Sequence, residues 1–347
     1  MDKKLPDDSY PVQNLRLFSK IKLITLDLDG TLLTTSSSVI PDRIIALSRS
    51  LRTFKYKVLV TLATGRTLSG IVPLLNNIQI KSTAPIIIYN GSIVVRNKTF
   101  EILHKKTFSH TALMKILEIT ANFRVSTLVY FCHWFGEAKL NEYVMGWSNT
   151  RRPKFEYNNM PIDWQTSFDV DKNINFSIAV IDTSEESHDI TKMLADKLSK
   201  IDEISISSGG ANYIEVKPDG INKGVALEFV SKELNIPRSE ILAIGDNDND
   251  LEMLSWAGIG VAVKNASKKA KQSSDYICDH DAFGGQSFVG TEGLGAWDAQ
   301  LVAIAPEVLP VIFERLEKRV QVGWFHVREL RVHAEPRRVF RQFGALS

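Results

Sequence analysis

Two acidic residues, Asp27 and Asp29, stand two positions apart at the end of an apolar run, Ile24 to Leu28. Side chains alternate faces along an extended chain, so both carboxylates lie on the same side of the backbone. Gly30 then permits a sharp turn that holds the pair at the end of a strand. Neighbouring carboxylates repel each other unless a cation lies between them, so the pair indicates a hard divalent metal. The alternative is a turn in which both acids only cap backbone amides.

A second acidic cluster follows another apolar run, Ile241 to Ile244, which is typical of a strand buried in a parallel sheet. The acidic and amide residues behind its closing glycine are Asp246, Asn247, Asp248, Asn249 and Asp250. Carboxylates at the ends of two buried strands are difficult to explain as solvated surface residues without a function. Together they provide about three or four oxygen ligands for one Mg2+, which binds few carboxylates and retains some water.

Two smaller signals are candidates for phosphate contacts. A third apolar run, Val58 to Ala63, ends at Thr64 and Gly65, where a hydroxyl and free backbone amides suit phosphate oxygens. Thr64 is also a candidate N-cap of the following helix. Lys223 stands at the start of a helical pattern, where its charge opposes the helix macrodipole. This lysine is therefore either incidental or retained to bind an anion.

In this order the four stretches resemble the motifs of the haloacid dehalogenase superfamily, and more narrowly its Cof-type sugar-phosphatase branch. The resemblance covers roughly residues 20–281 and includes Asn90-Gly91 and the run Tyr213 to Val216 as further landmarks. Four motifs in a fixed order are far more specific than a single motif. Lys264 and Asn247 depart from the residues usual in the family, but neither stands at a core catalytic position.

The resemblance implies an enzyme, a Mg2+-dependent phosphohydrolase of small phosphorylated metabolites, with sugar phosphates as the leading class. It implies that Asp27 attacks phosphorus to form an aspartyl-phosphate, and that Asp29 acts first as acid and then as base. A phosphomutase-type phosphotransferase with the same two acids remains an alternative. The second alternative is a non-enzymatic binding protein with the same fold. Such a protein is expected to lack one of the site acids, yet Asp27, Asp29, Asp246 and Asp250 are all present.

The resemblance also assigns the remaining site residues. The metal Mg2+ would be bound by Asp27, by the backbone carbonyl of Asp29 and by Asp246. The phosphoryl oxygens would be contacted by Thr64, Gly65, Lys223 and Asn249. Asp250 would orient Lys223 or a metal-bound water.

Alternating strand and helix patterns around the motifs predict an α/β fold, a doubly wound parallel-sheet core domain like that of the haloacid dehalogenases. The segment between the motifs mixes short alternating runs with helical patterns, which predicts an inserted α+β cap domain. Its aromatic residues are interpreted as the core of the cap, with stacking on a substrate ring as the alternative. The expected divisions are a flexible lead-in (1–19), the catalytic core (20–92 and 212–282), the cap (93–211) and a divergent C-terminal extension (283–347).

Composition agrees with an ordinary soluble enzyme. The 347 residues carry a net charge of +2, which argues neither for nor against a polyanionic partner, and a nucleic-acid partner is not expected. No apolar stretch is long enough for a membrane span. The two cysteines, Cys132 and Cys278, have no metal-binding spacing, so a reducing, cytoplasmic compartment is expected. The arginines and aromatic residues after Arg328 leave open a nucleic-acid or acidic-protein contact, a divergent extension or an artefact of sequence assembly.

Overall fold

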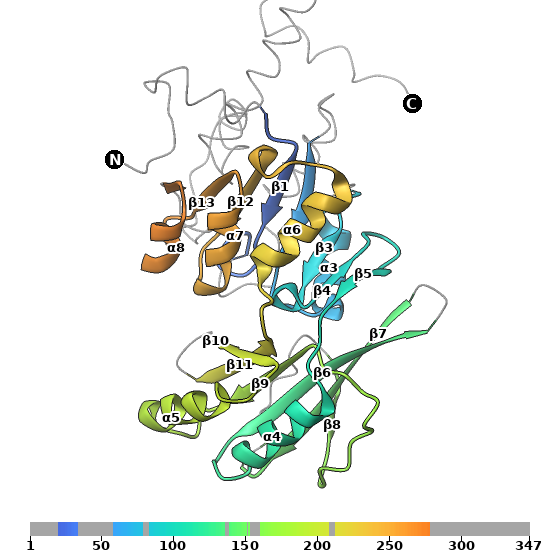
Figure 1. Ribbon diagram of the computed structural model, residues 1–347, viewed down its shortest axis with the longest axis vertical. Coiled ribbons are helices and arrows are strands. Elements are labelled where there is room, and N and C mark those ends of the chain that lie inside the picture. Colours follow the sequence, from blue (N-terminus) through green and yellow to red (C-terminus); the bar gives the residue numbers. More distant parts are fainter. Residues whose placement is uncertain are drawn as a thin grey trace, which may run out of the picture.

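The computed structural model of the chain describes residues 20–33, 58–78, 83–135, 139–150, 152, 160–207 and 212–277. It contains a parallel sheet with its helices and a separate six-stranded sheet with two helices (Figure 1). The expected α/β core with an inserted α+β cap is therefore confirmed. The predicted lead-in (1–19) and C-terminal extension (283–347) lie outside the described residues.

The parallel sheet has the strand order β14-β13-β12-β1-β2. Its strands are β1 (Leu23–Leu26), β2 (Leu59–Leu62), β12 (Ile241–Gly245), β13 (Ile259–Ala262) and β14 (Tyr276–Ile277). The central strand β1 pairs in parallel with both neighbours, so that Leu26 lies beside Leu62 and Ile244. Parallel strands end at one common edge, and open α/β sheets bind their ligands at that edge.

Four helices accompany this sheet: α3 (Leu68–Ile78), α6 (Lys223–Leu234), α7 (Leu251–Trp256) and α8 (Lys268–Ser273). Single 3-10 turns lie at η1 (Tyr89–Gly91), η3 (Arg238–Glu240) and η4 (Asp248–Asp250). Helix α6 begins where the side chain of Asn222 accepts a hydrogen bond from the amide of Val225 at 2.8 Å. It ends at Asn235, which adopts the left-handed conformation that asparagine tolerates. These caps fix the position of Lys223 at the helix start.

A small antiparallel sheet of β3 (Ile86–Ile88), β4 (Ile93–Val95) and β5 (Ile102–Lys105) adjoins the parallel sheet. It is joined to the end of β2 by a parallel bridge between Ala63 and Ile87. All ten residues from Ile86 to Val95, which form β3, β4 and the turn between them, are buried. Local hairpin pairing therefore places β4 and β5 with the core.

The second sheet has the order β10-β11-β9-β6-β7-β8. Its strands are β6 (Ser126–Phe135), β7 (Lys139–Ser148), β8 (Ile162–Trp164), β9 (Ile178–Asp182), β10 (Ile204–Ser207) and β11 (Tyr213–Pro218). Its helices are α4 (His110–Thr120) and α5 (His188–Leu198). Figure 1 shows both helices on the side of this sheet that faces away from the parallel sheet.

Both faces of the second sheet are buried. Residues such as Leu128 and Tyr130 on β6 belong to a core shared with the parallel-sheet domain, whereas Val129 and Phe131 pack beneath α4 and α5. Strands buried on two faces carry apolar residues at consecutive positions, which explains the near-continuous run from 128 to 132. One face of this sheet is thus packed against the domain that contains the parallel sheet.

The chain leaves the strands of the core for the second sheet after Lys105, where β5 ends. It returns to the parallel sheet after Pro218, where β11 ends. The division of the chain into domains at 92/93 and 211/212 remains a prediction. Among the helices that the structure describes, none combines the length and apolar character needed to cross a bilayer.

Candidate active site

Three predicted site residues follow the carboxyl ends of neighbouring parallel strands. Asp27 comes directly after β1, Asp246 directly after β12, and Thr64 two positions after the end of β2. The backbone ladder continues past the strand ends, since the amide of Asp27 donates to the carbonyl of Ile244 at 3.0 Å. In-register pairing therefore brings side chains from distant parts of the sequence to one edge.

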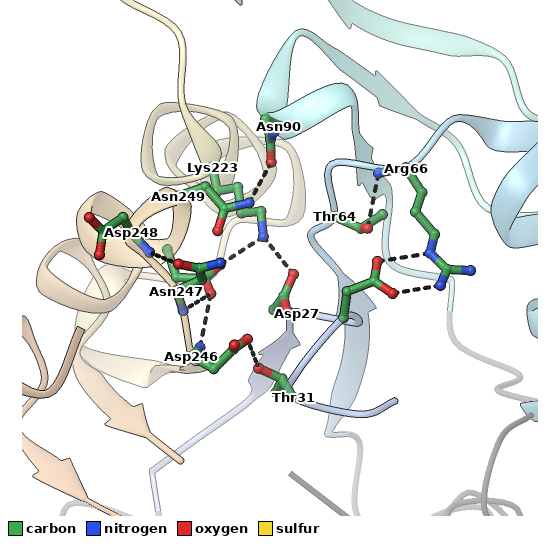
Figure 2. Close-up of polar contacts among 12 residues, drawn as sticks. Asp27, Thr31, Thr64, Arg66, Asn90, Lys223, Asp246, Asn247, Asp248 and Asn249 are labelled. Atoms are coloured by element: carbon green, nitrogen blue, oxygen red, sulfur yellow. Dashed lines mark hydrogen bonds and ion pairs between the residues drawn. The ribbon is translucent and has the colours of Figure 1, made fainter. Parts of the chain in front are cut away.

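Lys223 is the cation at the centre of this edge, and its side chain is fully buried. Its Nζ donates to Oδ1 of Asp27 at 2.5 Å and to Oδ1 of Asp250 at 2.7 Å (Figure 2). Burial alone lowers the pKa of Lys223, but the charges of the two carboxylates outweigh burial and raise the pKa above its ordinary value. A buried charge is tolerated only when it is paired in this way.

Asp250 is also fully buried and uses both of its oxygens within the protein. Its Oδ1 accepts from Lys223, and its Oδ2 accepts from the backbone amides of Asp246 and Asn247 at 2.9 and 3.1 Å. This carboxylate thus holds the loop after β12 in place and at the same time orients the lysine.

Three carboxylates gather beside the lysine. One ligand oxygen from each of Asp27, Asp246 and Asp250 lies within 4.8 Å of the other two, a spacing that fits one cation. Burial, followed by the charge of Asp250, raises the pKa of Asp27 well above its ordinary value and that of Asp246 to about 6. The raised pKa values show that ionised carboxylates are disfavoured at this buried edge, and a hard divalent cation would offset that penalty.

The turn after Asp29 shapes one wall of this carboxylate group. Gly30 has a φ of 90°, and a Cβ atom at this position would collide with the carboxylate of Asp246. Thr31 follows and donates from Oγ1 to Oδ1 of Asp246 at 2.8 Å (Figure 2). Glycine is therefore required here both by its backbone conformation and by the close approach of the acid.

The side chain of Asp29 lies outside the carboxylate group. It pairs with Arg66, with 2.8 Å from Nε to Oδ2 and 2.5 Å from Nη2 to Oδ1. About half of the Asp29 side chain is exposed, in contrast to the buried Asp27. Two parallel hydrogen bonds of this kind fix both partners in orientation.

The loop after β2 contains Thr64 and Gly65, which were predicted to contact phosphate. Thr64 is fully buried, and its hydroxyl accepts from the amide of Arg66 at 3.1 Å. The alternative reading of Thr64 as an N-cap is wrong, because the hydroxyl of Thr67 accepts from the amide of Gly70 at 3.0 Å at the start of α3. Gly65 lines a cavity of about 190 Å³ that Asp27 and Asp29 also line.

Asn249 is connected to the second sheet through a chain of hydrogen bonds. Its Nδ2 donates to Oδ1 of Asn90 at 3.0 Å (Figure 2), and Nδ2 of Asn90 donates to Oε1 of Glu215 at 2.7 Å. Glu215 lies on β11 and lines the same cavity. The cavity is therefore formed jointly by the core and the cap.

A second carboxylate of the cap reaches the core at the start of α3. Glu142 on β7 accepts from the backbone amides of Leu68 and Ser69 at 2.7 and 2.6 Å. It also accepts from the hydroxyl of Ser69 at 2.6 Å and from that of Tyr89 at 2.7 Å. The first amides of a helix have no partner within the helix, so an acid placed there is favourable. Glu142 thus joins the cap to the helix that follows the Thr64 loop.

The structure adds Arg66, Asn90, Glu142 and Glu215 to the residues expected from the sequence. Arg66 directly follows the Thr64-Gly65 turn, and Asn90 begins an Asn-Gly turn after the apolar run of β3, so both had a local signal. Glu142 and Glu215 stand on cap strands as single acids among alternating residues. Such a pattern shows that the acidic side chain points away from the apolar face of its strand, but it does not show which residue the side chain contacts.

A model of one protein family, described as haloacid dehalogenase-like hydrolase, matches residues 24–286. Among curated proteins, 5-amino-6-(5-phospho-D-ribitylamino)uracil phosphatase YcsE of Bacillus subtilis is 28% identical over 265 residues, which span 75% of this chain and 90% of that protein. Several further relatives are named as phosphatases, among them YxeH of the same organism, which is 26% identical over 259 residues.

Solved structures agree with this match. A haloacid dehalogenase-like hydrolase from Bacteroides thetaiotaomicron is 25% identical and superposes with a TM-score of 0.62 over 76% of this chain and 95% of its own. A HAD/COF-like hydrolase from Plasmodium vivax gives a TM-score of 0.63 over 85% of this chain and 96% of its own. The latter is 20% identical and supports the fold alone.

Proposed function

The chain belongs to the haloacid dehalogenase-like hydrolase family, and from that premise we propose that it hydrolyses sugar phosphates with Mg2+ through an aspartyl-phosphate on Asp27. Phosphatase action on small phosphorylated molecules is the general activity it shares with its relatives. The observation that carries the proposal is the buried Asp27 carboxylate, which lies at the sheet edge between Lys223 and the acids of the β12 loop.

The donor set at this edge fits Mg2+, which prefers carboxylate oxygens. Asp27 and Asp246 would hold the ion, whereas both oxygens of Asp250 already accept from Lys223 and backbone amides. The backbone carbonyl of Asp29 stays the proposed third ligand. When bound, the ion would neutralise charge on the phosphoryl oxygens.

The chain's own residues would carry the covalent steps. An oxygen of Asp27 attacks phosphorus, the bond from phosphorus to the ester oxygen breaks, and Asp29 gives its proton to the leaving alcohol. Water then attacks phosphorus, Asp29 takes the proton of that water, and the bond to Asp27 breaks to release inorganic phosphate. Each oxygen of Asp29 accepts one hydrogen bond from Arg66, which leaves a second lone pair on each oxygen for the proton that Asp29 would carry.

Positive and polar groups would hold the phosphoryl group during both steps. Lys223 fixes the Asp27 carboxylate and offers the only ammonium group bonded to it among the described residues. Asn249 keeps one N–H of its amide free of Asn90, since that contact uses only one of the two hydrogens. Thr64 and Gly65 stay the proposed contacts on the β2 side. Preorganised donors of this kind stabilise the charge that develops on oxygen.

The cavity supports a small leaving group. Its volume of about 190 Å³ matches a molecule of sugar size rather than a macromolecule. A cytoplasmic location is proposed as well, because Cys132 is a free, buried thiol. Burial, followed by the charge of Glu142, raises the pKa of this thiol to about 12, so it stays protonated and unreactive.

The test is phosphate release from a panel of sugar phosphates, nucleotides and cofactor phosphates, measured with and without Mg2+. We expect release from sugar phosphates that stops in excess EDTA and returns with added Mg2+. Asp27→Asn should abolish release while the circular dichroism spectrum stays that of the wild type. Full turnover by this variant would refute the covalent mechanism, and conversion of one sugar phosphate to its isomer without net release would identify a phosphomutase instead.

A further inference from the structure

Glu215 is an ionisable group of the cap that faces the reaction cavity. It lies in the middle of β11, between the buried residues Ile214 and Val216, whose side chains pack on the other face of the sheet beneath the cap helices. Because strand residues alternate faces, Glu215 is directed toward the core. It lines the cavity that Asp27 lines from the opposite domain.

Two hydrogen bonds fix the Glu215 side chain. Asn90 donates to Oε1 from Nδ2 at 2.7 Å, and Ser207 donates to the same oxygen from Oγ at 3.1 Å. A carboxylate can only accept, so the orientation of the Asn90 amide is fixed by its chemistry. Within the described part of the chain, Oε2 receives no hydrogen bond, and this oxygen retains its full capacity to accept.

Asn90 is itself held rigidly. It is buried, adopts a φ of 52° in the turn η1, and accepts from Asn249 on its other side. A side chain supported in this way keeps its position when a ligand binds. Glu215 is therefore a fixed negative charge with an open acceptor, rather than a mobile surface acid.

The charges around the cavity leave Glu215 uncompensated. The guanidinium of Arg66 also lines the cavity, but it is committed to Asp29 through both hydrogen bonds. The ammonium of Lys223 is committed to Asp27 and Asp250. The other cap residues on this wall include Ile178 and Val180, which are apolar. A second anionic group on the substrate would thus meet a like charge and, among the described residues that line the cavity, no cation that is free to pair with it.

We propose that Glu215 determines substrate specificity: it accepts hydrogen bonds from hydroxyls of an uncharged leaving group and excludes phosphate esters that carry a second anionic group. This inference rests on the proposed phosphatase function and narrows its substrate class to phosphorylated polyols and neutral sugars. Like charges brought together in a partly desolvated site disfavour binding strongly, and such repulsion is an effective source of selectivity.

The experiment compares glucitol 6-phosphate with 6-phosphogluconate, which have the same carbon chain and differ by a hydroxymethyl or a carboxylate at C1. We measure kcat/KM for both with Mg2+ in the wild type, Glu215→Gln and Glu215→Lys. Glutamine keeps an oxygen for Asn90 and Ser207 but removes the charge. We expect the wild type to prefer glucitol 6-phosphate, Glu215→Gln to lower the preference by about tenfold, and Glu215→Lys to lower it further.

Glu185→Gln is the matched control, because Glu185 is a cap carboxylate that pairs with Arg124 at the surface. It should keep the wild-type ratio of the two kcat/KM values. An unchanged ratio in folded, active Glu215→Gln would overturn the inference alone, since a merely structural role lowers both values together. A wild-type preference for 6-phosphogluconate would overturn it as well. No Mg2+-dependent release from any ester by the wild type would overturn the proposed function and this inference with it.

Discussion

Asp29 and Arg66 form a two-point ion pair in which both carboxylate oxygens are engaged, one by Nε at 2.8 Å and one by Nη2 at 2.5 Å. Asp27, only two residues earlier, has no such partner and instead meets the buried Lys223. The two acids of one strand end thus have different environments, one half exposed and paired with a guanidinium, the other buried beside an ammonium. Different environments are how two carboxylates acquire different chemical roles.

If Asp29 supplies the proton for the leaving group, Asp29→Asn should affect poor leaving groups most. A sugar alkoxide needs protonation, so turnover of a sugar phosphate should fall by about 10²- to 10⁴-fold. An activated phenol needs little help, and p-nitrophenyl phosphate should lose far less. Rapid-quench measurement of the first turnover would check that the chemical step is affected. Equal losses on both substrates would argue against Asp29 as the acid.

Lys223→Met should destabilise the fold as well as stop turnover. The change leaves the carboxylates of Asp27 and Asp250 buried without their shared cation, which costs about 3–5 kcal/mol. Urea denaturation gives the free energy of unfolding. Lys232→Met on the same helix is the control, since Lys232 is exposed and pairs only with Glu228, and its loss should cost about 0.5 kcal/mol or less. Similar costs for the two variants would contradict the structural role assigned to Lys223.

Stabilisation by Mg2+ should depend on pH through Asp246. Burial and then the charge of Asp250 raise its folded-state pKa from 3.8 to about 6. Without metal, the stability that this proton contributes is complete below about pH 4 and is lost as the pH rises through about 6. Mg2+ requires the ionised carboxylate, so metal and proton compete. The increase in Tm on adding millimolar MgCl2 should therefore be small near pH 5 and large near pH 7.5.

Sodium chloride at matched ionic strength is the control for that measurement, because it screens the carboxylates without binding between them. A Tm increase that is equal at both pH values would contradict the titration of Asp246 in the metal site. A Tm increase in Asp246→Asn as large as that of the wild type at pH 7.5 would contradict it as well.

Glu142→Gln should loosen the contact between the cap and α3. Each oxygen of Glu142 accepts two hydrogen bonds, and the amide replaces one of these oxygens by an NH2 group that cannot accept, so two of the four are lost. We expect a loss of about 1.5–3 kcal/mol in unfolding free energy. Hydrogen exchange of the Leu68 and Ser69 amides should be faster. Glu118→Gln on the exposed face of α4 is the control, and unchanged exchange in Glu142→Gln would show that the cap is held elsewhere.

The grouping of acids at one edge of the parallel sheet was largely predictable from the sequence because these residues follow strands. Apolar runs of four or five residues ending at Asp27 and Asp246 specify buried parallel strands, and parallel strands end together. The meeting of Lys223 with Asp27 follows from the same geometry, since α6 starts beside that edge. Local patterns were sufficient wherever a residue's place was set by the end of its own element.

The contacts between core and cap were not predictable in this way. The hydrogen bond from Asn90 to Glu215 joins residues 125 positions apart, one in the turn η1 of the core and one on strand β11 of the second sheet. No periodicity in either segment encodes how the sheets face each other, because that depends on packing across the whole interface. The pairing of β4 and β5 was not predictable for a related reason, since runs this short do not show whether they pair with β3 or with a later strand.

The alternation along the cap strands separates two kinds of mutational outcome. On β9, Ile178 and Val180 border the cavity, whereas Ala179 and Ile181 pack under the helices. Both sets are buried, so only conservative substitutions at the cavity-facing positions should retune which molecules are processed, whereas substitutions at the intervening positions should alter folding yield alone. Alternate residues of a cap strand can then diverge and change the substrate, while the residues at the edge of the parallel sheet that would contact the phosphate stay the same.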